Sequence, residues 1–150
     1  MTIALEFIDL ARRRHEMALI LVVEDERSIR QALSFELLDE GYTVHCASGI
    51  QEAVSALKAF QYDLIISDIF MDDGQGTQLM EFTRKMNKMI PFIIISAYPD
   101  SDLAVRVKDL LKDRFFTKPF YAAALTAKAG EILRTKMNPA ESWTETVSCP

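Results

Sequence analysis

The chain has 150 residues and a formal net charge of −5, and 49% of its residues are apolar and 26% are charged. This composition is typical of one globular domain with a sizeable core. The acidic balance argues against nucleic acid binding by this chain alone, because such binding depends on Lys and Arg that neutralise phosphates. No apolar run approaches the ~20 residues that a membrane-spanning helix needs, so membrane insertion is not expected.

Short apolar runs alternate with helical patterns along the chain. The first run, at 19–23, precedes a helix at 27–39 in which Ile29, Leu33 and Leu37 fall on one face. Residues 68–76 are expected to form a loop. Further strands are predicted at 42–46, 64–67, 92–95 and 114–117, alternating with helices at 50–60, 77–87, 102–112 and 119–136.

Five successive strand–helix units predict an α/β fold, with a single doubly wound five-stranded parallel sheet and five helices. Right-handed crossovers leave few topologies, and we expect the flavodoxin-like strand order 2-1-3-4-5. Ligands of such sheets bind beyond the carboxyl ends of the strands, at the point where the strand order reverses. Here that point lies between the first and third strands.

The two cysteines, Cys46 and Cys149, are too few for a disulfide framework and form no CxxC metal pair. This usage indicates a reducing, cytoplasmic compartment, and we expect Cys46, which stands in an apolar run, to fill part of the core. The pattern predicts an N-terminal extension at 1–17 that can be helical, a domain at 18–136 and a tail or truncated linker at 137–150.

Reactive side chains stand where four of the apolar runs end. Glu24 and Asp25 follow the first run, Asp68 ends the third, Ser96 the fourth and Lys118 the fifth. Since the carboxyl ends of parallel strands open onto one crevice, we expect these side chains to meet in one pocket. Three acids, a hydroxyl and an ammonium suit a divalent cation and a phosphoryl group.

The segments that carry these side chains resemble the four signature segments of response-regulator receiver domains in order and in spacing. They are 22–26 (VVEDE), 63–71 (DLIISDIFM), 95–97 (ISA) and 117–120 (TKPF), and the resemblance covers about residues 19–136. It implies a phospho-acceptor of a two-component system or phosphorelay, which assists its own phosphorylation and is not an enzyme acting on a separate substrate. The partner would be a sensor histidine kinase or a phosphotransfer protein. The chain would stand alone or belong to a longer regulator or hybrid kinase.

Mg²⁺ is the expected cofactor. It prefers oxygen ligands and keeps several waters, and Asp25 and Asp68 can each offer one carboxylate oxygen. The resemblance adds the backbone carbonyl of Phe70, and the longer side chain of Glu24 would hold a metal-bound water. An alternative interpretation makes Glu24 and Asp25 a pair of acids at a helix N-terminus, but it leaves Asp68 unexplained.

Asp68 is the expected nucleophile, since a carboxylate can accept a phosphoryl group as an acyl phosphate. Lys118 and Ser96 would hold phosphoryl oxygens, and the small side chain of Ala97 leaves the approach open. The resemblance also implies a cis peptide bond between Lys118 and Pro119.

The resemblance further implies a conformational switch. In the family, the hydroxyl at the position of Ser96 moves toward the phosphoryl group, and an aromatic ring at the position of Phe115 turns inward behind it. Plain core packing is the alternative for Phe115. The surface formed by 102–112, 114–117 and 119–136 would change, and the same surface can support a homodimer.

Departures from the family's pattern lie at the rim of the expected pocket. Asp72 stands where the family usually has Pro, and together with Asp73 it adds negative charge near the pocket. Phe70 and Tyr98 occupy the places that gate the hydrolytic water in the family. Two large rings there predict slow self-dephosphorylation.

Other function classes fit the residues less well. A haloacid-dehalogenase hydrolase needs a second acid two residues after its nucleophile, where this chain has Phe70. An EF-hand needs Gly at the sixth position of its loop and Glu at the twelfth, where Asp73 and Leu79 stand. A flavodoxin needs a phosphate loop after its first strand, where Glu24 and Asp25 would repel phosphate. An interaction module that does not switch remains an alternative, which labelling with acetyl phosphate can distinguish.

Overall fold

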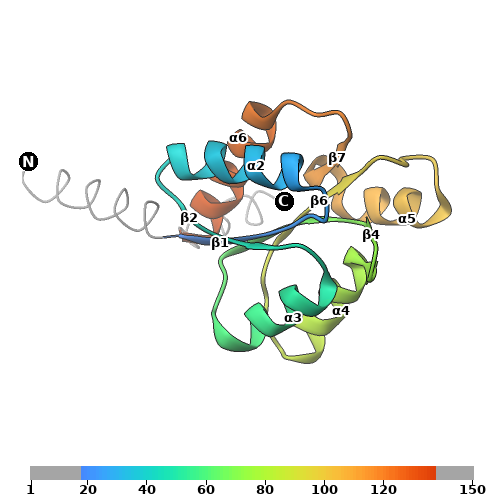
Figure 1. Cartoon of the computed structure of the whole chain (residues 1–150), viewed down its shortest axis with the longest axis horizontal. Helices are drawn as coiled ribbons and strands as arrows, with labels where there is room; N and C mark the ends of the chain where they lie inside the picture. The colour runs from blue at the N-terminus through green and yellow to red at the C-terminus, as the bar shows by residue number, and fades with distance from the viewer. Residues whose placement is uncertain (1–17, 138–150) are drawn as a thin grey trace, which may run out of the picture.

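The computed structural model describes residues 18–137, and their centre is one five-stranded parallel sheet (Figure 1). Its strand order is β2-β1-β3-β6-β7, which is the order 2-1-3-4-5 when the five strands are counted along the chain. The predicted flavodoxin-like topology is therefore confirmed. The strands are β1 Leu19–Val23, β2 Thr43–Ala47, β3 Leu64–Asp68, β6 Phe92–Ser96 and β7 Phe115–Thr117.

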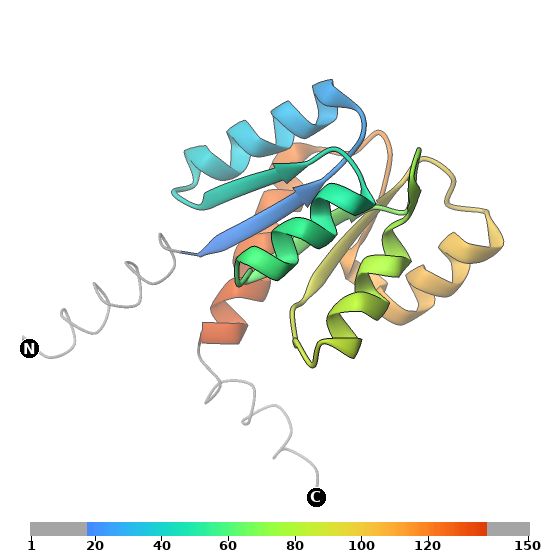
Figure 2. The ribbon, with the colours of Figure 1, turned by 60° about the horizontal axis from the view of Figure 1, so that its bottom comes forward.

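Helices α2 and α6 cover one face of the sheet, and α3, α4 and α5 cover the other (Figures 1 and 2). A 3-10 turn at Lys112–Arg114 joins α5 to β7. The bounds of the helices are α2 Arg27–Asp39, α3 Ile50–Ala59, α4 Gly76–Lys85, α5 Asp102–Leu111 and α6 Ala122–Met137.

Two apolar clusters, one on each face, hold the central strands in place. Leu21 and Ile65 pack on the side of α3 and α4, while Ile20 and Ile66 pack on the side of α2 and α6. Because both faces are covered, β1 is apolar throughout and β3 is apolar from Leu64 to Ile66, without the alternation of a half-exposed strand. This packing fixes where the two strands end.

Two local expectations about the backbone differ from the structure. A short antiparallel hairpin, β4 Phe70–Met71 and β5 Gly74–Gln75, replaces the expected loop after β3. Helix α6 begins at Ala122 rather than at 119. Its first backbone hydrogen bonds run from the N–H groups of Ala124 and Leu125 to the carbonyl of Tyr121.

The expectation that Cys46 fills the core is wrong, because this residue is exposed. β2 is an edge strand of the sheet. The Sγ atom of Cys46 lies 2.9 Å from the Oγ atom of Ser34 in α2. The neighbouring Ala47 occupies the buried position instead.

None of the helices within residues 18–137 is long and apolar enough to cross a membrane. The expected extension at 1–17 and the tail at 138–150 lie outside the described residues. Met137, which the sequence assigned to the tail, is the last residue of α6.

Candidate functional site

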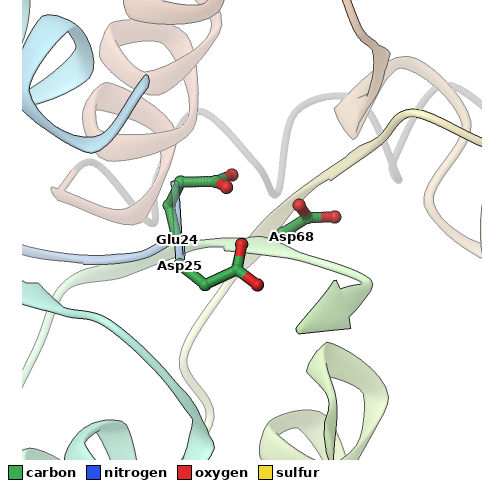
Figure 3. A group of neighbouring side chains, drawn as sticks. All are labelled: Glu24, Asp25 and Asp68. Carbon is green, nitrogen blue, oxygen red and sulfur yellow. The ribbon is translucent and has the colours of Figure 1, made fainter. Parts of the chain in front are cut away.

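Three acids meet beyond the carboxyl ends of β1 and β3. β1 and β3 are paired in register, with Val23 opposite Ser67, so the residues that follow them face each other. Glu24, Asp25 and Asp68 offer carboxylate oxygens that all lie within 4.8 Å of one another (Figure 3). The structure thus brings together the three acids that the sequence placed in one pocket.

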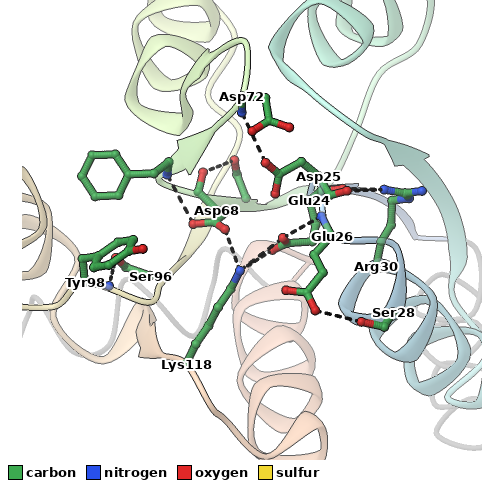
Figure 4. Close-up of polar contacts among 12 residues, drawn as sticks. Glu24, Asp25, Glu26, Ser28, Arg30, Asp68, Asp72, Ser96, Tyr98 and Lys118 are labelled. Carbon is green, nitrogen blue, oxygen red and sulfur yellow. Dashed lines mark hydrogen bonds and ion pairs between the residues drawn. The ribbon is translucent and has the colours of Figure 1, made fainter.

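Lys118 joins two of these acids from the end of β7. Its Nζ atom lies 2.6 Å from Oδ2 of Asp68 and 3.0 Å from Oε2 of Glu24 (Figure 4). Its backbone N–H donates to the carbonyl of Ser96 at 2.8 Å, which ties the side chain's origin to the neighbouring strand β6. The peptide bond between Lys118 and Pro119 is cis.

Burial shapes the ionisation of this cluster. Burial of Glu24, followed by the charge of Asp68, raises the pKa of Glu24 to about 7 against the opposing effect of Lys118. Burial alone would lower the pKa of Lys118, but hydrogen bonds to Asp68 and Glu24 outweigh it and raise that pKa. Lys118 therefore stays charged, while Glu24 can exchange a proton near neutral pH.

The donor set fits Mg²⁺. The three carboxylates are hard oxygen donors, and Lys118 is the one cation with an ion pair to them among the described residues. When all three acids are ionised, the cluster carries more negative than positive charge. The buried Oε2 atom of Glu24 accepts no hydrogen bond, and its one close charged partner among the described residues is Nζ of Lys118 at 3.0 Å.

The raised pKa of Glu24 predicts that stability depends on pH. Folded Glu24 keeps its proton up to a pKa of about 7, whereas the unfolded chain loses it near 4.5. The stability that this proton contributes is thus fully present below about pH 4.5 and is lost as the pH rises to about 7. With metal chelated, we expect urea unfolding to give a free energy lower by on the order of 2 kcal/mol at about pH 8 than at about pH 5.

Glu24→Gln provides the comparison for this prediction, because glutamine is nearly isosteric and does not titrate. The pH dependence of the native chain minus that of Glu24→Gln gives the part that requires the Glu24 carboxyl, together with its interaction with Asp68 and Lys118. Identical slopes in the two proteins would contradict the prediction.

Ser96 and its neighbours border the acidic site at the end of β6. The Oγ atom of Ser96 is buried at the end of β6 and accepts a hydrogen bond from the backbone N–H of Tyr98 at 3.0 Å. The ring of Tyr98 stands edge-on to that of Phe70 with centroids 6.0 Å apart, and both rings line a shallow pocket with Ala97. The backbone N–H of Phe70 donates to Oδ1 of Asp68 at 3.3 Å.

The remaining residues singled out from the sequence lie in different surroundings. Phe115 is half-buried and packs against the cluster on the side of α3, α4 and α5. The backbone N–H of Asp72 reaches Oδ2 of Asp25 at 3.3 Å (Figure 4). The carboxylate of Asp73, which the sequence placed at the pocket rim, accepts hydrogen bonds from the backbone N–H groups of Ile50 and Gln51 at the start of α3.

Two residues that support the acids were not found from the sequence. The Nη1 atom of Arg30 in α2 donates to the backbone carbonyls of Glu24 at 2.8 Å and Asp25 at 3.3 Å. A Cβ atom on Gly76, at the start of α4, would overlap the carbonyl oxygen of Asp68. An arginine on a helix and a glycine in a loop carry no sequence signal that separates these roles from ordinary ones.

Comparisons with known proteins agree on one family. The family model described as response regulator receiver domain matches residues 20–130. The transcriptional regulatory protein PmrA of Pectobacterium parmentieri is 30% identical over 123 residues, which are 82% of this chain and 55% of PmrA. The sensor kinase CckA of Brucella abortus (strain 2308) is 32% identical over 118 residues, which are 77% of this chain and 12% of CckA.

A solved structure gives the same result. The response regulator TrrA from Thermotoga maritima, in complex with Mg²⁺ and BeF, is 34% identical with a TM-score of 0.66. The match covers 77% of this chain and 99% of that chain. The chain thus spans nearly all of a receiver domain but only about half of PmrA.

Proposed function

This chain belongs to the response regulator receiver domain family, and on that basis we propose that it accepts a phosphoryl group on Asp68 with Mg²⁺ as cofactor. The donor is a phosphohistidine on a sensor histidine kinase or phosphotransfer protein in the cytoplasm. The chain acts as a signalling switch rather than as an enzyme, either alone or within a longer regulator or hybrid kinase. The observation that carries this proposal is the contact of Asp68 with Lys118 beside two further acids.

Asp25, Asp68 and the carbonyl of Phe70 would hold Mg²⁺ directly and Glu24 would hold it through a water, and the cation when bound supplies positive charge against the phosphoryl oxygens. A carboxylate oxygen of Asp68 attacks phosphorus, the O–P bond forms, and the N–P bond of the phosphohistidine breaks with its electron pair going to the imidazole.

Lys118 and Ser96 complete the arrangement. The Lys118 ammonium, now on Oδ2 of Asp68, is placed to move onto a phosphoryl oxygen. The Oγ atom of Ser96 already accepts from Tyr98, so its own proton can be donated to another phosphoryl oxygen. To make this bond, the hydroxyl of Ser96 would move toward the phosphoryl group, and Phe115 would turn inward behind it. The surface of α5, β7 and α6 would then change, and the same surface can support a homodimer.

Incubation with acetyl phosphate and Mg²⁺ tests this proposal. Intact mass should rise by one phosphoryl group, the gain should disappear when the metal is chelated, and peptide mapping should place it on Asp68. A folded chain that gains no phosphoryl group at any Mg²⁺ concentration would overturn the proposal. It would favour the interaction module that keeps the fold without switching.

The two rings at the pocket predict a long-lived acyl phosphate. Phe70 has no polar group that could orient an attacking water, its backbone N–H donates to Asp68, and its ring contacts that of Tyr98 edge-on. We expect the double variant Phe70→Asn, Tyr98→Glu to lose its phosphoryl group about 10-fold faster, the rate equivalent of one hydrogen bond worth ~1.4 kcal/mol. Intact mass followed over time measures this, and an unchanged lifetime would count against shielding by the rings.

A further inference from the structure

The turn between β4 and β5 reaches back to the acids at the end of β1. Its first residue, Asp72, directs its backbone N–H at Oδ2 of Asp25 over 3.3 Å, across 47 positions of sequence (Figure 4). Proline, the residue expected here from the family's pattern, has no N–H to donate. The tie between Asp72 and Asp25 therefore depends on a residue in which this chain departs from its family.

The second residue of the turn, Asp73, is anchored to a helix on the other side. Its Oδ1 atom accepts from the N–H of Ile50 at 2.8 Å and its Oδ2 atom from that of Gln51 at 3.1 Å. The residue before α3 is Gly49, which has no side chain to cap the helix. A Cβ atom at Gly49 would lie 2.6 Å from Oδ1 of Asp73, so the missing side chain makes room for this carboxylate.

The charge on Asp73 suits this position. Hydrogen bonds from the N–H groups of Ile50 and Gln51 lower the pKa of Asp73, so that it is ionised at neutral pH. Negative charge at a helix N-terminus is favourable, because the first N–H groups of the helix have no partner within it.

The rest of the hairpin leaves the turn little freedom. Phe70 pairs with Gln75 and Met71 with Gly74. The N–H of Gln75 donates to Oε1 of Gln78 at 2.7 Å, which fixes the hairpin to the start of α4. The hydrogen bonds of Asp73 to α3 add a third attachment to the turn that carries the N–H of Asp72.

From these contacts we infer that Asp72 and Asp73 position Asp25 for Mg²⁺: Asp73 anchors the turn to α3, and the N–H of Asp72 holds one oxygen of Asp25 so that the other remains for the cation. This inference rests on the proposed function, since it concerns the same cation. Partners that orient a metal ligand typically change metal affinity 10- to 100-fold when removed.

The test is Mg²⁺ affinity of the full chain, measured by isothermal titration calorimetry. Asp73→Ala and Asp72→Pro are each expected to weaken Mg²⁺ binding by about 10-fold. The double variant should be no weaker than the worse single one, because both act through the same N–H. Asp73→Asn, which keeps one acceptor oxygen for Ile50, should recover part of the affinity.

Glu52→Ala is the matched control. Glu52 also stabilises the start of α3, through bonds from Ser48 N at 3.1 Å and Ser48 Oγ at 2.6 Å, but it does not contact the turn. This variant should lower the melting temperature while leaving Mg²⁺ affinity unchanged. Should Asp73→Ala unfold, Asp72→Pro and Asp73→Asn still decide the question.

The outcomes separate the inference from the proposed function. A native chain that does not bind Mg²⁺ overturns both. Native binding that Asp72→Pro and Asp73→Ala leave unchanged overturns the inference alone. Equal weakening by Asp73→Ala and Glu52→Ala also overturns it, since Asp73 would then act only through the stability of α3.

Discussion

Asp68→Asn is expected to abolish phosphoryl gain from acetyl phosphate, because an amide lacks the carboxylate oxygen that attacks phosphorus. Asp68 is 5% exposed and asparagine is nearly isosteric, so the variant should remain folded. Lys118 keeps its ion pair with Glu24 at 3.0 Å. Intact mass under conditions that label the native chain measures the loss, and thermal unfolding shows whether the fold is retained.

Asp39→Asn is the control for this prediction. Asp39 is an exposed acid at the end of α2, and its replacement should leave labelling unchanged. Labelling of Asp68→Asn at the native rate would place the phosphoryl group on another residue. A second readout is available, since the charge of Asp68 helps to raise the pKa of Glu24. The stability of Asp68→Asn in chelator should therefore depend less on pH than that of the native chain.

Lys118→Met should slow phosphorylation by acetyl phosphate about 10²- to 10³-fold, the usual cost of removing one preorganised group that faces developing charge. The Nζ atom now contacts Asp68 at 2.6 Å, so it stands within reach of any phosphoryl group placed there. Methionine preserves the apolar stem but not the charge. The initial rate of mass gain measures the effect. It is taken at saturating Mg²⁺, so that the metal ion offsets the charge of the acids in the variant that lacks Lys118.

Lys128→Met is the matched control for this rate. Lys128 is also ion-paired, with Asp113 at 2.8 Å and Glu131 at 2.9 Å, but it lies on α6 away from the acids. Its loss should leave the rate within about 2-fold of native, because Lys128 does not contact the acids and a surface ion pair contributes little to the stability of the fold. Equal rates for Lys118→Met and the native chain would show that the ammonium takes no part in the transfer.

The strands could be predicted because the sheet is buried on both faces. The apolar runs that contain Ile20 in β1 and Ile66 in β3 have no polar interruption, so the sequence shows where each run ends and which side chain follows. The register of β1 with β3 then brings Asp25 and Asp68 together. Their roles in metal binding and phosphoryl transfer stay predictions.

Other features depend on contacts that local pattern does not encode. The strands β4 and β5 have two residues each, too few for an alternating pattern. Cys46 lies in an apolar run, yet its strand is at the edge of the sheet. Ile50, which donates to the carboxylate of Asp73, is 23 residues away in sequence. The sequence therefore indicated that Asp73 lies near the acids, but it could not predict the hydrogen bond to α3.

The bridge that Lys118 forms between Glu24 and Asp68 has a consequence for how the protein matures. Repulsion within a cluster of acids that has no counter-charge would prevent folding until a cation binds, as in domains that fold only around a metal. Here the counter-charge is covalently part of the chain, at 2.6 and 3.0 Å from the two acids. We therefore expect newly synthesised chains to fold without Mg²⁺, so that the cation would be needed for the proposed phosphorylation and not for folding.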